Sequence, residues 1–173
     1  MTSTGATDGT NWLAEASRDP AACRHAWRRS GAGLMMLPAG RRWDVLTVPG
    51  TLGLTALAVL SRAAARPGPV LADRGSENVG FLVPPGTGAR LLGTGLRVAG
   101  EGTWIVVPRP GVRGRGLRWL VAPDGSGRLN APVPLELALH EAAAELAADG
   151  RAGSVRPGRR PGVGHPDHTA DDL

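Results

Sequence analysis

The sequence predicts an α+β fold, with a small mixed or antiparallel sheet and flanking helices. Apolar residues recur at helical spacing in several segments, and short apolar runs bounded by Gly and Pro suit strands. These two kinds of segment do not alternate strictly along the chain. The 173 residues, 42% of them hydrophobic, provide for one core of ordinary size. We therefore expect a single globular domain over residues 10–150.

The N-terminal part is expected to be helical after a disordered start. Residues 1–9 are small and polar, a composition that disfavours a packed structure. A short helix is predicted over 11–16. Asp19 and Pro20 then provide an N-cap and a first-turn proline for a second helix that ends near Arg29.

Short apolar runs between turn residues predict the strands. The first two runs, 34–37 and 43–48, follow each other closely, and we expect them to be neighbours in the sheet. Connectors rich in turn residues separate the remaining runs, which lie at 69–72, 80–83, 104–107 and 118–121.

Two further helices are predicted from apolar periodicity. Apolar residues recur at three- and four-residue steps over 51–66, before a Pro-Gly stop. The same spacing runs from Leu135 to Leu146, and Gly150 is placed to end that helix. Residues 151–173 carry Arg, Gly, Pro, His and Asp without an apolar period, so we expect a disordered tail.

We expect the protein to be cytoplasmic. Its apolar stretches are broken within about ten residues, well short of the roughly 20 that cross a bilayer. The first ten residues lack the basic start and apolar run of an export signal. Cys23 is the lone cysteine, so no internal disulfide can form, which agrees with a reducing compartment.

The charge points to an anionic partner. The formal net charge is +5 and all 20 basic residues are Arg, a usage that a GC-rich bacterial genome also favours through its codons. The loop between the two last predicted strands could lie along a phosphate backbone through Arg109, Arg113, Arg115 and Arg118. No stacking aromatic accompanies them, so a solvated basic hairpin is the alternative.

Residues 83–90 imitate the phosphate loop of nucleotide hydrolases, but their chemistry differs. That loop begins with Gly and ends with a Lys that reaches the outer phosphates and a hydroxyl that holds magnesium. Here Val83, Ala89 and Arg90 occupy those positions. We therefore interpret the segment as a connector from a strand to a helix.

No metal site is predicted. The His and Asp residues within 165–172 are ligand types, but a polar tail supplies no rigid frame to orient them. Cys23 and His25 lie two residues apart on a predicted helix and point away from each other. His140 is expected to be a partly exposed helix residue.

Three segments together resemble the N-terminal domain of bifunctional DNA primase/polymerases, the prim-pol branch of the archaeo-eukaryotic primase superfamily. Residues 44–49, Asp-Val-Leu-Thr-Val-Pro, resemble the family's acidic strand, which normally ends in Asp-x-Asp. Residues 75–84 are similar to the segment in which a Gly-rich turn precedes a nucleotide-contacting His. Residues 97–108, with Gly-rich turns and Trp-Ile-Val-Val-Pro, resemble the third segment, which begins with an Asp.

The resemblance implies a degenerate, primase-polymerase-like domain. In an active member the acids hold two divalent ions, which bind through anionic oxygen. The two acids of the first segment fall at Thr47 and Pro49, the His at Asn78 and the third acid at Arg97. We therefore expect no catalytic residues, no cofactor and no enzymatic activity, and hypothesise a domain that binds a nucleotide, a nucleic acid or a protein.

Two other hypotheses stay open. An active primase/polymerase, a nucleotidyltransferase with a relocated Mg²⁺ or Mn²⁺ site, would require Asp44, Glu77 and Glu101 to converge; Asp73 is also close in sequence. Alternatively, the domain could be a protein-interaction or regulatory module without a nucleic-acid role. Such a module would use an exposed apolar face and tryptophans, including Trp12, Trp27 and Trp119.

Overall fold

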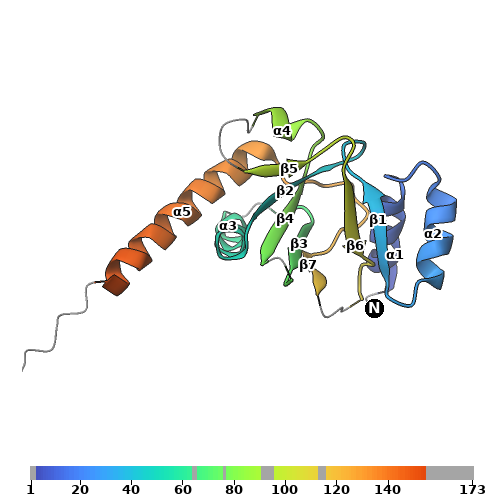
Figure 1. Cartoon of the computed structure of the whole chain (residues 1–173), viewed down its shortest axis with the longest axis horizontal. Helices are drawn as coiled ribbons and strands as arrows, with labels where there is room; N and C mark the ends of the chain where they lie inside the picture. Colours follow the sequence, from blue (N-terminus) through green and yellow to red (C-terminus); the bar gives the residue numbers. More distant parts are fainter. Residues whose placement is uncertain (1–2, 64–65, 76, 91–95, 113–115, 155–173) are drawn as a thin grey trace, which may run out of the picture.

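The computed structural model describes residues 3–63, 66–75, 77–90, 96–112 and 116–154 (Figure 1). The predicted α+β class is confirmed. The elements in chain order are α1 (Ser3–Ala14), α2 (Pro20–Arg29), β1 (Leu34–Pro38), β2 (Asp44–Pro49), α3 (Gly50–Arg62), β3 (Val70–Asp73), β4 (Asn78–Val83), α4 (Thr87–Arg90), β5 (Arg97–Ala99), β6 (Trp104–Pro108), β7 (Leu117–Val121) and α5 (Pro132–Ser154). None of the described helices combines the length and hydrophobicity that a bilayer crossing requires.

The strands form two antiparallel sheets. Five strands pair in the order β5-β2-β4-β3-β7, and β1 pairs with β6 in a separate two-stranded sheet. The prediction that β1 and β2 are neighbours is therefore wrong. A tight turn, in which the Gly40 amide donates to the Trp43 carbonyl at 2.9 Å, carries the chain from one sheet to the other, and β6 takes the place beside β1.

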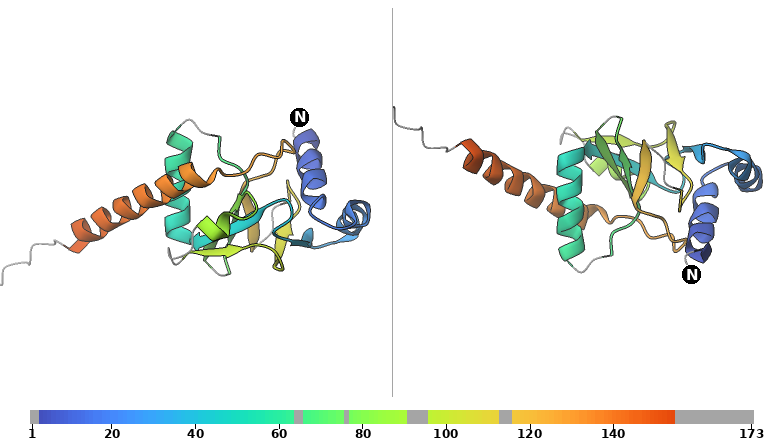
Figure 2. Two further views of the ribbon diagram at one scale, coloured as in Figure 1. Left: turned by 90° about the horizontal axis from the view of Figure 1, so that it is seen from above. Right: turned by 90° about the horizontal axis from the view of Figure 1, so that it is seen from below.

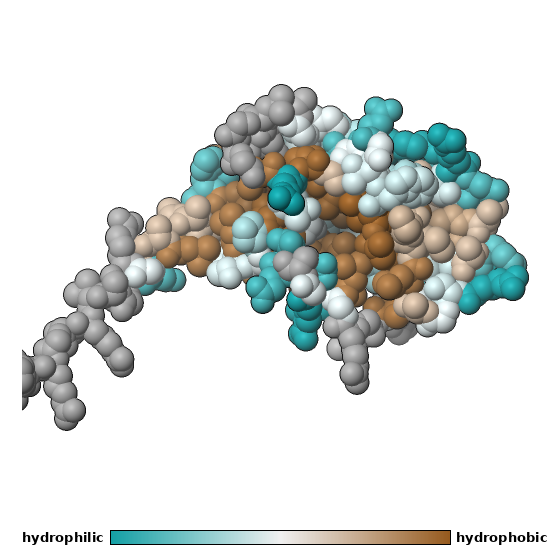
Figure 3. Space-filling model, in the orientation of Figure 1, coloured by the Kyte–Doolittle hydropathy of each residue, from teal (hydrophilic) through white to brown (hydrophobic). Residues whose placement is uncertain are grey.

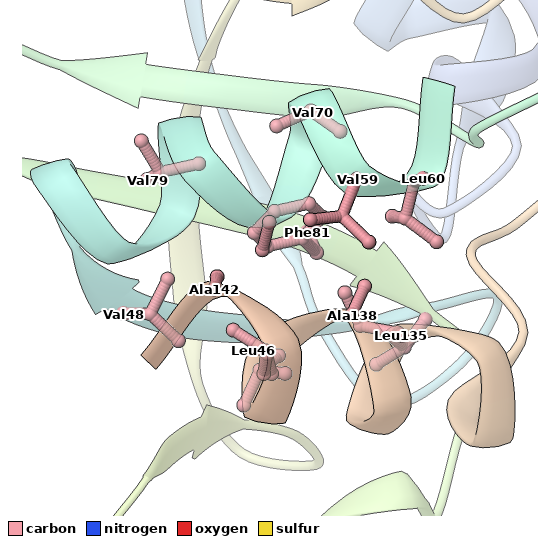
Figure 4. Close-up of a cluster of buried hydrophobic side chains, with 13 residues drawn as sticks. Leu46, Val48, Val59, Leu60, Val70, Val79, Phe81, Leu135, Ala138 and Ala142 are labelled. Atoms are coloured by element: carbon pink, nitrogen blue, oxygen red, sulfur yellow. The ribbon is translucent and has the colours of Figure 1, made fainter. Parts of the chain in front are cut away.

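Each face of the five-stranded sheet contributes to its own buried apolar cluster. On one face Leu46 and Phe81 pack under α3 and α5, whose side chains Val59 and Leu135 are drawn with them in Figure 4. The other face packs against the two-stranded sheet, α1 and α2, through a cluster that includes Trp43 and other residues on these elements. Figure 2 shows α3 crossing α5 at one end of the molecule and α1 and α2 at the other.

The two N-terminal helices differ in how far the sequence predicted them. Asp19 caps α2 as expected, because its side chain accepts from the Ala22 amide at 2.9 Å and Pro20 follows. The expected disorder of residues 1–9 is wrong from Ser3 onward, where α1 begins. This polar helix is ordered by docking, since Gly9 lies so close to the Pro123 carbonyl that a side chain there would collide with it.

The last helix is longer than predicted. Gly150 was expected to end it, but α5 continues to Ser154. A glycine that ends a helix usually adopts a positive φ, and Gly150 does not. Residues 155–173 lie outside the described part of the chain.

Candidate functional site

The four positions that the resemblance assigned to the family's acids and His lie on two cross-strand rungs of the sheet that follow each other on one face. Thr47 on β2 is paired with Arg97 on β5 and, on its other side, with Gly80 on β4. Pro49 is paired with Asn78. Direct cross-strand partners have Cβ atoms about 5 Å apart, so these side chains are neighbours.

All four side chains belong to the same sheet face. Leu46 and Val48 point into the cluster under α3 and α5, so Thr47 and Pro49, which alternate with them, point to the opposite face. Thr47 and Asn78 are half-buried, whereas Pro49 and Arg97 are exposed. At this end of the strands the face is therefore open to a ligand.

Gly80 shapes the centre of this face. A Cβ built on Gly80 would lie 2.9 Å from Cγ1 of Val45, closer than real Cβ contacts allow. The missing side chain lets Val45 lie over β4, next to the rung that holds Thr47 and Arg97.

A groove of about 600 Å³ adjoins the rung formed by Pro49 and Asn78, at the start of α3. Asp73 on β3 is the cross-strand partner of Asn78, and its carboxylate accepts from the Gly75 amide at 2.9 Å. The Glu77 carbonyl accepts from the Gly50 amide at 2.7 Å and so holds the first residue of α3. The residues that line the groove are Pro49, Gly50, Thr51, Leu54, Ala72, Asp73, Arg74, Glu77, Asn78, Val79 and Arg118.

Comparison with known proteins identifies the family. The family model for the N-terminal domain of bifunctional DNA primase/polymerases matches residues 3–138. The chain belongs to this family. No curated protein and no solved structure matches it. Membership implies a function of the primase-polymerase type, with DNA or nucleotides as partners.

The four residues at the positions that the resemblance assigns do not fit a two-metal centre. Thr47, Pro49, Asn78 and Arg97 offer a hydroxyl, a ring, an amide and a guanidinium, whereas hard dications require anionic oxygen. Asp73 stands next to Asn78, but in the described part of the chain no three His, Cys, Asp or Glu side chains are grouped so that they could hold a metal ion.

The acids considered for a relocated centre do not come together in the prim-pol domain. Asp44 begins β2, whereas Glu77 precedes the residue paired with the end of that strand, so about 17 Å of strand separates their positions. Glu101 is exposed in the turn between β5 and β6. The relocated site is therefore not supported by the geometry.

Asp44 instead has a structural role. It is 2% exposed, and its Oδ2 accepts from the Gly86 amide at 2.8 Å in the turn between β4 and α4. Burial raises the pKa of this carboxyl above its ordinary value, and the hydrogen bond from Gly86 opposes that shift. The segment that imitates a phosphate loop is thus held to β2 by a buried acid, and it leads into α4 as the predicted connector does.

The predicted arginine loop is only partly described. Arg113 and Arg115 lie outside the described residues. Arg118 lines the groove beside Asn78, and Arg109 follows β6, where its amide donates to the Gly33 carbonyl at 2.7 Å. The two described arginines therefore lie in different places, one at the groove and one at the two-stranded sheet.

Sequence reasoning missed Trp104. This side chain is 59% exposed and lies beside a hollow of about 500 Å³ that Arg18 and Arg41 also line. The alternation in 104–107 carries the signal, because Trp104 and Val106 share one side of a strand whose other side is buried. The sequence does not show which of the two sides is covered.

Proposed function

We propose that this prim-pol domain binds nucleic acid or a nucleotide and does not catalyse metal-dependent nucleotidyl transfer. One observation carries the proposal: the positions that the resemblance assigns to the family's acids and His lie close together on one open face, and they hold Thr47, Pro49, Asn78 and Arg97. In this proposal the strands that form the site are retained, but none of the four side chains is negatively charged. Paired dications have no carboxylate ligands at these positions.

The face suits an anionic ligand better than a cation. Arg97 places a guanidinium opposite Thr47, where the resemblance expects an acid. A guanidinium can donate two parallel hydrogen bonds to a phosphate group. Arg74 and Arg118 line the adjoining groove, although Asp73 and Glu77 line it too. We therefore place the phosphate contact at Arg97 rather than deep in the groove.

The catalytic part of the proposal is tested by primer extension. The full chain is incubated with a primed template, nucleoside triphosphates and Mg²⁺ or Mn²⁺, beside an active member of the family as the positive control. We expect no extension with either ion. Robust extension that disappears in Asp44→Asn or Glu101→Gln would overturn the proposal and restore the relocated metal site.

The binding part is tested by titration of labelled nucleotide and labelled oligonucleotide with the wild-type chain. We expect Arg97→Ala to weaken nucleotide binding several-fold and to lower the salt slope by about 1, as for one lost phosphate contact. Arg62→Ala is the matched control, because that exposed arginine is paired with Glu145 at 2.7 Å on the far side of the sheet. A wild-type chain that binds neither ligand would contradict the proposal and favour a module that binds only proteins.

A further inference from the structure

The two-stranded sheet has one buried and one exposed apolar face. Leu37 and Val107 point inward and are fully buried. Four of the side chains that alternate with them are exposed, and we call them the outer β1–β6 face: Leu34 at 40%, Met36 at 57%, Trp104 at 59% and Val106 at 41%. Pro108, on the same side of β6, is buried and marks the end of this face. Met36 is paired directly with Val106, so the four side chains form one surface. In Figure 3, apolar side chains gather where Figure 1 places β1 and β6.

Arginines lie at one end of the outer β1–β6 face. At the Trp104 end, Arg18 and Arg41 line the hollow of about 500 Å³ that the indole also lines. At the other end, the face stops at Pro108, before Arg109. About 13 Å of strand separates Trp104 from Pro108, the last residue of β6. Cationic side chains therefore border the apolar surface at its Trp104 end.

The acids near this surface leave a positive balance. Glu101 lines the same hollow as Arg18 and Arg41, so two cations face one anion there. Glu15 carries a second negative charge nearby, but its carboxylate is paired with Arg42 at 2.6 Å. Charge complementarity therefore favours an anionic occupant.

The size of the surface argues against a stable protein interface. Such interfaces use about 20–30 residues from each partner, and the outer β1–β6 face offers four large apolar side chains. A single strand of nucleic acid needs a smaller binding surface than a protein partner. It requires one or more exposed rings or apolar side chains for its bases and cations for its phosphates, which is the composition found here.

We propose that the outer β1–β6 face binds a single strand of nucleic acid. A base stacks on Trp104, neighbouring bases lie on Met36 and Val106, and the phosphates contact Arg18 and Arg41. The inference rests on the proposed function, because it names where and in what form this prim-pol domain takes its nucleic acid. The surface is separate from the Thr47–Arg97 rung, which belongs to the other sheet.

The experiment titrates labelled oligo(dT) and oligo(rU) of about 16 nucleotides with the full chain and its variants. We expect Trp104→Ala to weaken binding about 5- to 150-fold, the equivalent of the 1–3 kcal/mol that one stacked base contributes. Trp104→Phe keeps a ring and should retain most of the affinity. Arg41→Ala should lower the salt slope by about 1, and Trp104→Ala should leave it unchanged. The two oligonucleotides distinguish DNA from RNA as the strand.

The control is Leu137→Ala on α5, a substitution of an apolar side chain that is 65% exposed and distant from the outer β1–β6 face. Because Trp104 is exposed, its variants should fold, and circular dichroism checks this. Binding that Trp104→Ala leaves unchanged would overturn the inference while the proposed function stands. A wild-type chain that binds no oligonucleotide would overturn both. Trp104→Ala that alters self-association in sedimentation, but not oligonucleotide binding, would make the face a protein-docking surface instead.

Discussion

At the scale of single residues, Asp44 shows how position overrides residue type. The sequence places this acid at the start of the first family-like segment, and it stays open as a metal ligand there. In the fold it lies on the same side of β2 as Leu46, opposite to Thr47, with its carboxylate under the Gly86 turn. Its Oδ1 is buried and has no hydrogen-bond partner among the described residues. Successive side chains of a strand point to opposite faces, so an acid's position in the strand decides whether its carboxylate faces the candidate site or stabilises the fold.

Asp44→Asn should change how stability depends on pH. The raised pKa means that the folded state binds the proton more tightly than the unfolded state does, so this group's contribution to the free energy of unfolding falls as the pH rises from the ordinary value of 3.8 through the folded pKa. Asparagine can still accept from Gly86 but does not titrate. We expect urea titrations to show the variant gaining stability relative to wild type between acidic and neutral pH.

Asp124→Asn is the matched control for that measurement and should give the opposite sign. Hydrogen bonds from Ser126 lower the pKa of this exposed carboxyl, so its contribution is present at neutral pH and is lost as the pH falls through the folded pKa. The variant should therefore lose stability relative to wild type as the pH rises. A difference between Asp44→Asn and wild type that is constant with pH would contradict the assignment of a buried, raised carboxyl.

At the scale of elements, the sequence predicted the positions of strands better than it predicted which strands pair. Apolar runs bounded by Gly and Pro located β2 and β4 to within one or two residues, because local pattern alone determines where such strands begin and end. The partner of β1 was predicted wrongly, since pairing with β6 joins residues about 70 positions apart, and no local signal records it. Gly150 was read as a helix end by its residue type, yet it lies inside α5.

Gly53→Ala should strongly destabilise the packing of α3 on the sheet. A Cβ on Gly53 would lie 2.5 Å from Cβ of Val79, an atom that cannot move without β4. Overpacking of this kind costs about 1–3 kcal/mol. Thermal and urea unfolding of the full chain measure the loss.

Gly150→Ala serves as the control and has the opposite expected sign. A Cβ at this position of α5 would meet nothing within 4 Å, and alanine favours a helix over glycine by about 0.5–1 kcal/mol. Stabilisation by Gly150→Ala and destabilisation by Gly53→Ala would together support the described packing. A loss of stability in Gly150→Ala would instead restore the predicted helix end.

At the scale of the whole molecule, Asn130 joins three segments that the sequence keeps apart. It is 3% exposed; its Nδ2 donates to the Pro69 and Leu82 carbonyls at 3.0 Å each, and its Oδ1 accepts from the Gly68 amide at 2.9 Å. These bonds connect the entry to β3, the end of β4 and the segment that leads into α5. A polar residue in a connector gives no sign of this role in the sequence, because its partners are about 50 to 60 residues away.

Asn130→Ala should lower the free energy of unfolding by about 1–3 kcal/mol, since it leaves the buried Gly68 amide without its acceptor, whereas the Pro69 and Leu82 carbonyls each keep a backbone donor. Urea unfolding measures the change. Asn11→Ala is the control, because Asn11 is exposed on α1 and its loss should change stability by no more than about 0.5 kcal/mol. Equal stability of the two variants would show that the three segments are held together by other contacts.

The candidate site was predictable only in part, because its geometry depends on residues that are far apart in the sequence. Residue-by-residue comparison with the family picked out Thr47, Pro49, Asn78 and Arg97, and the strand register brings them together. The outer β1–β6 face could not be predicted, because its exposure depends on which side of the two-stranded sheet the rest of the chain covers.

Gly80 fixes the register of β4 against β2, although it contributes no side chain to the site. Sliding β4 by one position along β2 would bring Val79 or Phe81 to the place now left empty beneath Val45, and neither would fit there. The glycine therefore favours the observed register of the two strands over a shift by one residue. Asn78 stands opposite Pro49 only in that alignment, so the geometry of the candidate face depends on the absence of a side chain at the neighbouring position of β4 on that face.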